Sequence, residues 1–232
     1  GSATILVAHR GGLRAGSPRS QGASYTTGMS LFGVDDRRTL EQKMRQEGRL
    51  PPGQSLTLKW PVLHYGETPR FDPATWRFRA AGLVSNPLSL SWEEFLALPR
   101  VEVTSDFHCV TRWSRFDNHW EGVAFRTLSE LARPSAEATH VMIHSADGYT
   151  TNAPLSDLRQ DNVLLAFKHD TQPLPPEHGG PIRLVVPKLY GWKSAKWVSG
   201  LEFIAHDQPG FWEQNGYHMY GDPWKEQRFD SD

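Results

Sequence analysis

The sequence predicts an α+β fold, a β-rich mixed domain with a few short helices. Short runs of β-branched and aromatic residues recur between turn residues from Ser55 onward, as expected for strands. Two patterns typical of helix starts interrupt these runs. The spacing is too irregular for a repeat architecture, and the strands do not alternate regularly with helices, so a mixed sheet fits better than a doubly wound parallel one.

Three regions are expected along the chain. Residues 1–54 form an N-terminal extension, in which a flexible leader rich in Gly, Ser and Arg precedes a short surface helix over 35–47 that ends at Gly48. Met29 is a candidate natural start. Residues 55–206 form the functional domain, and 207–232 form an aromatic C-terminal tail that we expect to pack on it.

Strands and helices of the 55–206 domain follow from local patterns. Ser91 and Thr127 each precede a glutamate by three positions, the capping-box pattern of a helix start, and Pro99 and Pro134 are expected to end these helices. The predicted strands are Val101–Phe107, His140–His144, Val163–Phe167, Ile182–Val186 and Trp197–Ala205.

Composition excludes several classes of function. The chain of 232 residues is 38% hydrophobic, enough for a real core. Its 25 Lys+Arg balance 26 Asp+Glu without strong clustering, which argues against a nucleic-acid partner. One cysteine excludes a disulfide framework, Cys-x-x-Cys metal sites, thiolate-bound iron–sulfur clusters and c-type haem. No apolar run approaches the roughly 20 residues of a membrane span, so we expect no span and a cytoplasmic location.

The single cysteine is the first candidate for chemistry. Cys109 lies in the block 105–114, just after an alternating strand, and His108, Arg112 and Arg115 would favour its thiolate form. A lone cysteine is otherwise a small buried hydrophobe. An alternative is a cysteine-nucleophile hydrolase. Its candidate bases are His108, His119, His140 and His144.

A second block, 174–198, offers groups suited to a phosphate. Gly179–Gly180 permits close backbone approach, and Arg183, Lys193 and Lys196 are potential donors. Basic residues in loops are also commonly solvated surface groups. A non-enzymatic alternative is an aromatic-rich ligand-binding module, because the chain has nine tryptophans.

Taken together, these blocks resemble the oxidoreductase molybdopterin-binding domain of sulfite oxidases, plant-type nitrate reductases and the bacterial protein-methionine-sulfoxide reductase catalytic subunit. The resemblance covers about residues 60–205. It rests on Pro-Val-Leu-His-Tyr (61–65), Cys-Val-Thr-Arg-Trp-Ser (109–114), and the pair His-Gly-Gly-Pro-Ile-Arg (178–183) and Lys-Ser-Ala-Lys-Trp (193–197), in that order.

The resemblance implies a sulfite oxidase-type fold that binds molybdenum and molybdopterin. It makes Cys109 the protein ligand to the metal, and a soft thiolate suits a molybdenum already bound by the pterin's two sulfurs. Ser145 is a weaker candidate because the loop before Tyr149 aligns ambiguously. The implied cofactor-binding residues are Val62, Leu63, His64, Tyr65, Cys109, Ser145, His178, Arg183, Ser194, Ala195 and Lys196.

The implied activity is oxygen-atom transfer on a small oxyanion or sulfoxide. Sulfite oxidases carry an arginine in the first block where this chain has Leu63, which argues against sulfite. Catalytic candidates besides Cys109 are Arg112 and Tyr149, with Arg115 as a further oxyanion-binding candidate. The expected partners are a small-molecule substrate and a separate unknown electron donor or acceptor, because no cytochrome-like or flavin-binding region is recognised.

Overall fold

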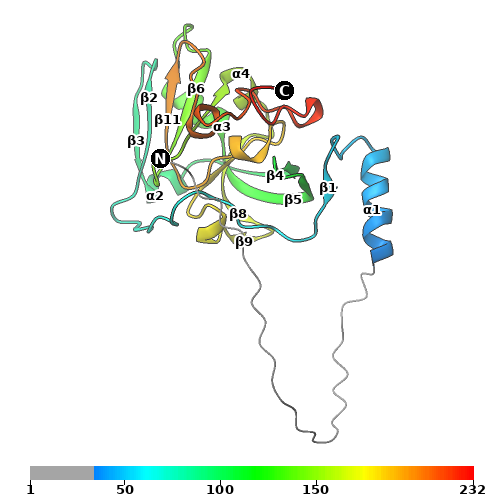
Figure 1. Cartoon of the computed structure of the whole chain (residues 1–232). Coiled ribbons are helices and arrows are strands. Elements are labelled where there is room, and N and C mark those ends of the chain that lie inside the picture. The colour runs from blue at the N-terminus through cyan, green and yellow to red at the C-terminus, as the bar shows by residue number, and fades with distance from the viewer. Residues whose placement is uncertain (1–33) are drawn as a thin grey trace, which may run out of the picture.

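Two mixed β-sheets form the body of the protein, and a helix lies at its side (Figure 1). The computed structural model describes residues 34–232, so the predicted leader and Met29 lie outside the described residues. The α+β fold class is confirmed. Within the described part, none of the helices is both long and apolar enough to cross a bilayer.

The first sheet is built around the long strand β5 (Trp113–Ala124). Its order is β1-β5-β8-β10, with β4 paired to β5 and β9 paired to β8; β1 runs parallel to β5 and every other pairing is antiparallel. The other strands are β1 (Ser55–Leu56), β4 (Arg100–His108), β8 (Leu164–His169), β9 (Gln172–Pro173) and β10 (Arg183–Val185).

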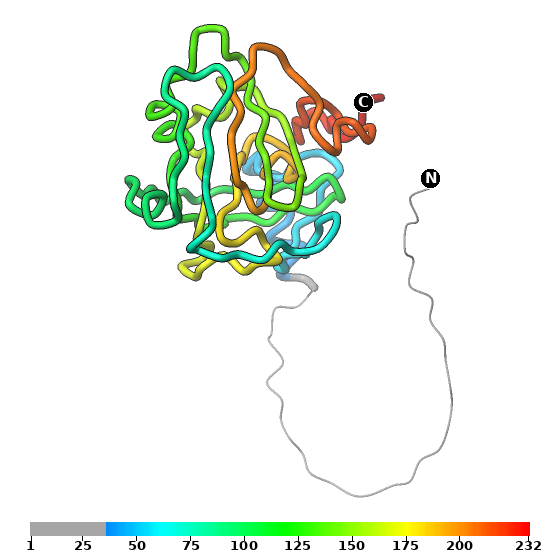
Figure 2. The backbone as a smooth tube through the Cα atoms, turned by 90° about the vertical axis from the view of Figure 1, so that its left-hand side faces the viewer, coloured from blue at the N-terminus to red at the C-terminus, as the bar shows by residue number. Residues whose placement is uncertain are grey.

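The second sheet has the order β3-β2-β11-β6-β7. Strands β2 and β11 are parallel, and the other pairs are antiparallel. Figure 2 views this sheet from its outer side, with the C-terminal segment next to it. Its strands are β2 (Arg77–Gly82), β3 (Leu88–Ser91), β6 (His140–Ser145), β7 (Thr150–Pro154) and β11 (Val198–Ile204).

The main core lies between the sheets. Phe78 and Phe203 from the second sheet pack in one fully buried cluster with Val123 and Leu165 from the first. The opposite face of the first sheet is covered as well, because Trp120 and other buried residues form a second cluster there. The first sheet is therefore buried on both of its faces.

The helices are short and connect or cover the sheets. Ser91 caps α2 with a complete capping box to Glu94, as predicted.

The expected cap at Thr127 is wrong. Helix α3 begins at Phe125, directly after β5, because the Phe125 ring is fully buried and its N–H donates to Val163 O. The α-helices are α1 (Val34–Gln46), α2 (Trp92–Leu96), α3 (Phe125–Ala132), α4 (Leu155–Leu158) and α5 (Phe211–Gln214), with 3₁₀ turns at Pro176–His178, Gly191–Lys193 and Pro223–Lys225.

Candidate active site

A cavity of about 900 Å³ opens where five segments of the chain meet. They are the loop 60–70, the turn after β4, the β6–β7 turn, the segment 178–197 and the C-terminal segment 211–217. Its size is at the upper end of the range for small-molecule pockets. The three sequence blocks are therefore brought to one place by the fold.

Cys109 is the first residue after β4 and lines this cavity. A tight turn holds it: its N–H donates to Trp113 O (2.8 Å), and its carbonyl accepts from the N–H of Arg112 (3.0 Å) and from Gln54 Nε2 (3.0 Å). The half-buried Sγ lies 3.1 Å from Thr111 Oγ1. Burial raises the pKa of the thiol, so the free sulfur is kept neutral.

Arg183 and Lys196 form a cationic end of the cavity. Arg183 is 2% exposed and donates to His178 O (3.0 Å) and Ser194 O (2.9 Å). Lys196 Nζ donates to Glu177 O (2.7 Å). Among the side chains of residues 36–232, no carboxylate forms a salt bridge with either cation. Burial, and then the charge of Arg183, lowers the pKa of Lys196 to about 7, while burial lowers that of Arg183 to about 10. This end is electrostatically suited to an anion.

His178 also lines this end of the cavity, but its imidazole ring is neutral. Its ring stacks on Trp60 with the ring centroids 3.9 Å apart, and burial lowers its pKa to about 4. Its buried Nδ1 finds no hydrogen-bond partner among the described residues. Gly179, at φ 110°, allows the loop to approach Lys196, since a Cβ there would lie 3.2 Å from Lys196 Cα. This nitrogen is a buried polar group that the described residues leave without a hydrogen-bond partner, which is unusual for a folded protein.

The structure gathers most predicted site residues and leaves some outside. Val62, Ser145 and Arg112 are not among the residues that line the cavity. Val62 is exposed, and Ser145 is buried in the β6–β7 hairpin, where its N–H donates to Tyr149 O. The predicted residues that line the cavity are Leu63, His64, Tyr65, Cys109, Tyr149, His178, Arg183, Ser194, Ala195 and Lys196.

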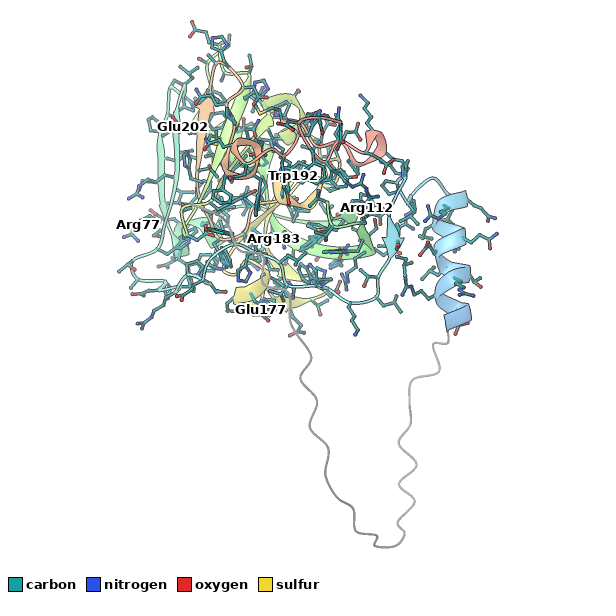
Figure 3. The ribbon with its side chains drawn as sticks, viewed as in Figure 1. Arg77, Arg112, Glu177, Arg183, Trp192 and Glu202 are labelled. Atoms are coloured by element: carbon teal, nitrogen blue, oxygen red, sulfur yellow. The ribbon has the colours of Figure 1, made fainter. Side chains whose placement is uncertain are left out.

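The two predicted arginines of the Cys109 region point elsewhere. The Arg112 side chain is 62% exposed and lies 4.0 Å from Glu226, well away from Arg183 (Figure 3). Its backbone adopts φ 70° in the tight turn after β4. Arg115 pairs with Asp170 at 2.6 Å, on the first sheet. The hydroxyl of the third candidate, Tyr149, donates to Trp192 O at 2.7 Å, so it is already engaged in holding the wall.

Sequence reasoning missed two contributions to the cavity. Gln54, from the predicted extension, is 1% exposed and fixes the Cys109 carbonyl; no local pattern signals this. Phe211, Trp212 and Tyr217 of the C-terminal tail line the cavity itself. The aromatic composition of the tail was the available signal for that role.

We expect sulfate to bind the cofactor-free protein about tenfold more tightly at pH 6 than at pH 8. Lys196, with a pKa near 7, is mostly charged at pH 6 and mostly neutral at pH 8, so anion binding takes up a proton and weakens as the pH rises through 7. Sulfate keeps its own charge over this range. Calorimetric titration at the two pH values measures the difference.

Lys196→Met should remove this pH dependence, whereas Lys59→Met, at an exposed lysine outside the cavity, should preserve it. Equal sulfate affinity of the parent protein at both pH values would contradict the assignment of the cationic end.

Comparison with known proteins identifies the family. Residues 65–212 match the model of the oxidoreductase molybdopterin binding domain. The chain is 50% identical over 185 residues to an uncharacterized oxidoreductase, YuiH, of Bacillus subtilis, covering 79% of this chain and 93% of that protein. It is 33% identical over 168 residues to the protein-methionine-sulfoxide reductase catalytic subunit MsrP of Campylobacter jejuni, covering 65% of this chain and 56% of the relative.

A solved structure shares the fold. The sulfane dehydrogenase SoxCD from Paracoccus pantotrophus superposes with a TM-score of 0.56 at 25% identity, over 62% of this chain and 41% of that one. The chain therefore spans just over half of the MsrP protein and well under half of the SoxCD chain.

The cavity residues fit a molybdopterin bearing molybdenum. A soft sulfur faces the cavity at Cys109, and the cations Arg183 and Lys196 have no salt-bridge partner in the described chain, as a phosphate site requires. The buried Arg183 Nε and His178 Nδ1 are unpartnered donors or acceptors within residues 34–232. With this match of family and site, the chain belongs to the oxidoreductase molybdopterin-binding domain family and is a molybdenum-cofactor-dependent oxidoreductase.

Proposed function

We propose that this protein catalyses oxygen-atom transfer on a small substrate and that a sulfoxide is favoured over an oxyanion. The observation that carries the proposal is the position of the Cys109 thiol, in a cavity that has a cationic end at Arg183 and Lys196 and a group of aromatic side chains. The name of the MsrP relative supports a sulfoxide. Leu63, in place of the arginine expected for sulfite, also favours an uncharged substrate.

The proposed overall reaction is R₂SO + 2 e⁻ + 2 H⁺ → R₂S + H₂O. When bound, the molybdenum cofactor supplies a two-electron centre that exchanges an oxygen atom. Cys109 would hold the metal, and His178, Arg183 and Lys196 would hold the pterin and its phosphate. The electrons come from a separate one-electron carrier, which is also part of this proposal.

The residues of the chain supply position and exclude water. The rings of Trp60 and Phe107 cover the Arg183 guanidinium at 5.7 and 5.2 Å from its carbon, so its charge acts through little solvent. The turn from Cys109 to Trp113 and the Gln54 amide fix the position of the sulfur. We propose these roles for the site residues. The cytoplasmic location of the protein stays a prediction.

The cysteine-nucleophile alternative is less well supported. A nucleophilic cysteine needs a lowered pKa or an adjacent base, whereas burial raises the pKa of Cys109. Its neighbour His108 is buried, and the ring Nδ1 lies 2.8 Å from Ser114 Oγ instead.

The test is to produce the protein in cells that synthesise the cofactor and to measure metal, pterin and turnover. We expect about one molybdenum and one pterin per chain, and sulfoxide-dependent oxidation of a reduced viologen dye. Sulfite oxidation with ferricyanide and nitrate reduction serve as comparisons. Stable, metal-free protein from such cells, or turnover with sulfite and no sulfoxide, would contradict the proposal.

A further inference from the structure

One side of the cavity is a continuous wall of aromatic rings. We define the aromatic wall as Tyr65, Trp192, Phe211, Trp212 and Tyr217, all of which line the cavity. Centroids of neighbouring rings are close: Tyr65 and Phe211 at 5.2 Å, Phe211 and Trp212 at 5.0 Å, Trp212 and Tyr217 at 4.9 Å, and Tyr217 and Trp192 at 5.1 Å. Three of the five rings come from the C-terminal segment.

The aromatic wall, the cationic end and Cys109 all line the same cavity. The cationic end has the features of an anion site. The wall has none, and it offers polarisable faces and edges instead.

The wall is held in place by buried polar contacts. Glu213, next to Trp212, is buried and accepts from Trp192 Nε1 (2.8 Å), Thr151 Oγ1 (3.0 Å) and Lys193 Nζ (2.6 Å). Gly210 lies so close to β7 that a Cβ would meet Thr151 Cα at 2.5 Å. The wall is therefore preformed and does not need a ligand to assemble it.

The carboxylates that line the cavity, Glu67 and Asp147, are close in sequence to Tyr65 and to Tyr149. Arg70 lines the cavity as well, so the lining outside Arg183 and Lys196 holds two carboxylates and one cation and forms no second cationic cluster. An uncharged, flat apolar group can contact several rings of the wall at once, with ring spacings typical of aromatic contacts.

We propose that the aromatic wall is a substrate subsite and that the preferred substrates are uncharged sulfoxides that carry an aryl group. This inference rests on the proposed sulfoxide reduction and names its substrate class. The aryl group would contact the rings of Phe211 and Trp212 while the sulfoxide oxygen faces the Cys109 side of the cavity. The reaction is the one balanced above, with R an aryl group and a small alkyl group.

The experiment compares methyl phenyl sulfoxide with dimethyl sulfoxide in the purified holoenzyme, with reduced viologen as the electron donor. The parent should favour the aryl substrate in kcat/KM by about tenfold or more. Trp212→Leu, which keeps an apolar side chain and removes the ring, should bring this ratio close to one, because it removes a ring that the aryl group contacts. Phe211→Leu, a milder change, should lower the ratio in the same direction.

The matched control is Trp224→Leu. Trp224 lies on the same C-terminal segment, is 46% exposed and is not among the cavity-lining residues, so the substrate ratio should not change. A second readout needs no turnover: methyl phenyl sulfone, titrated into the holoenzyme and followed by tryptophan fluorescence, should bind the parent and Trp224→Leu and bind Trp212→Leu about tenfold more weakly.

The outcomes separate the two proposals. An unchanged ratio in both Trp212→Leu and Phe211→Leu would overturn the subsite and leave sulfoxide reduction standing. Loss of pterin from Trp212→Leu and its retention in Trp224→Leu would also overturn it, because the wall would then belong to the cofactor site. If neither sulfoxide is reduced and the sulfone still binds through Trp212, the subsite stands and the proposed function fails.

Discussion

Cys109→Ser is expected to abolish turnover and the visible charge-transfer absorption of the holoenzyme while leaving the protein folded. The replacement oxygen is harder and far less acidic than sulfur, so it is a poor ligand for molybdenum. Even partners outside the first ligand shell cost 10- to 100-fold when removed, so we expect a loss of roughly a hundredfold or more. Visible spectra and viologen-linked kinetics measure both effects.

The fold should survive because the changed atom contributes little to packing. Sγ is half-buried, and its hydrogen-bond partner Thr111 Oγ1 can bond equally well to a serine hydroxyl. Pterin should stay bound through Arg183 and Lys196. Thr111→Val is the matched control, since it alters the neighbour of the sulfur and keeps the sulfur itself; most of its absorption should remain. Parental spectrum and turnover in Cys109→Ser would show that Cys109 is not the ligand.

Strands were predicted best from the sequence where one face or both faces of the strand are buried. Val101–Phe107 became β4 and Trp197–Ala205 contains β11, with ends shifted by one residue, because alternation or continuous apolar runs report burial directly. The longest strand, β5, was missed. Its polar residues, such as Arg115 and Asn118, are satisfied by hydrogen bonds within the sheet, and no local pattern distinguishes such a strand from a polar loop.

The candidate site was predicted where its residues lie in recognisable sequence blocks and was missed where distant segments supply it. Cys109 and Arg183 belong to blocks whose chemistry is visible locally. That Arg183 is buried and Arg112 exposed was not visible, because both are cations next to loops and only the backbone of the folded chain decides which one turns inward. Gln54 reaches the Cys109 carbonyl, and Phe211, Trp212 and Tyr217 reach the cavity, through tertiary contacts alone.

Glu213→Ala is expected to lower the free energy of unfolding by about 3–5 kcal/mol. The side chains of Glu213 and Lys193 are both fully buried, and their charged atoms are 2.6 Å apart. Removing the carboxylate leaves the Lys193 charge inside the protein without its counter-charge. Asn152 and Met219 still offer oxygen acceptors to Lys193 Nζ, so the loss is mainly electrostatic, and urea unfolding of the cofactor-free protein measures it.

Two variants test whether the uncompensated charge is the cause. The double change Lys193→Met with Glu213→Leu removes both charges and should recover much of the loss, because a buried ion pair contributes little beyond apolar residues of similar volume. Glu202→Ala breaks an exposed hydrogen-bonded contact between the carboxylate and His144 Nε2, at 3.0 Å, and should cost less than about 1 kcal/mol. Burial lowers the pKa of Lys193, and Glu213 opposes this effect, so removing Glu213 should lower the pKa of Lys193 further. As the pH rises, Lys193 then becomes neutral in the folded state before it does in the unfolded state, and part of the lost stability should return. A Glu213→Ala protein as stable as the parent at pH 7 would show that the pair does not hold the C-terminal segment in place.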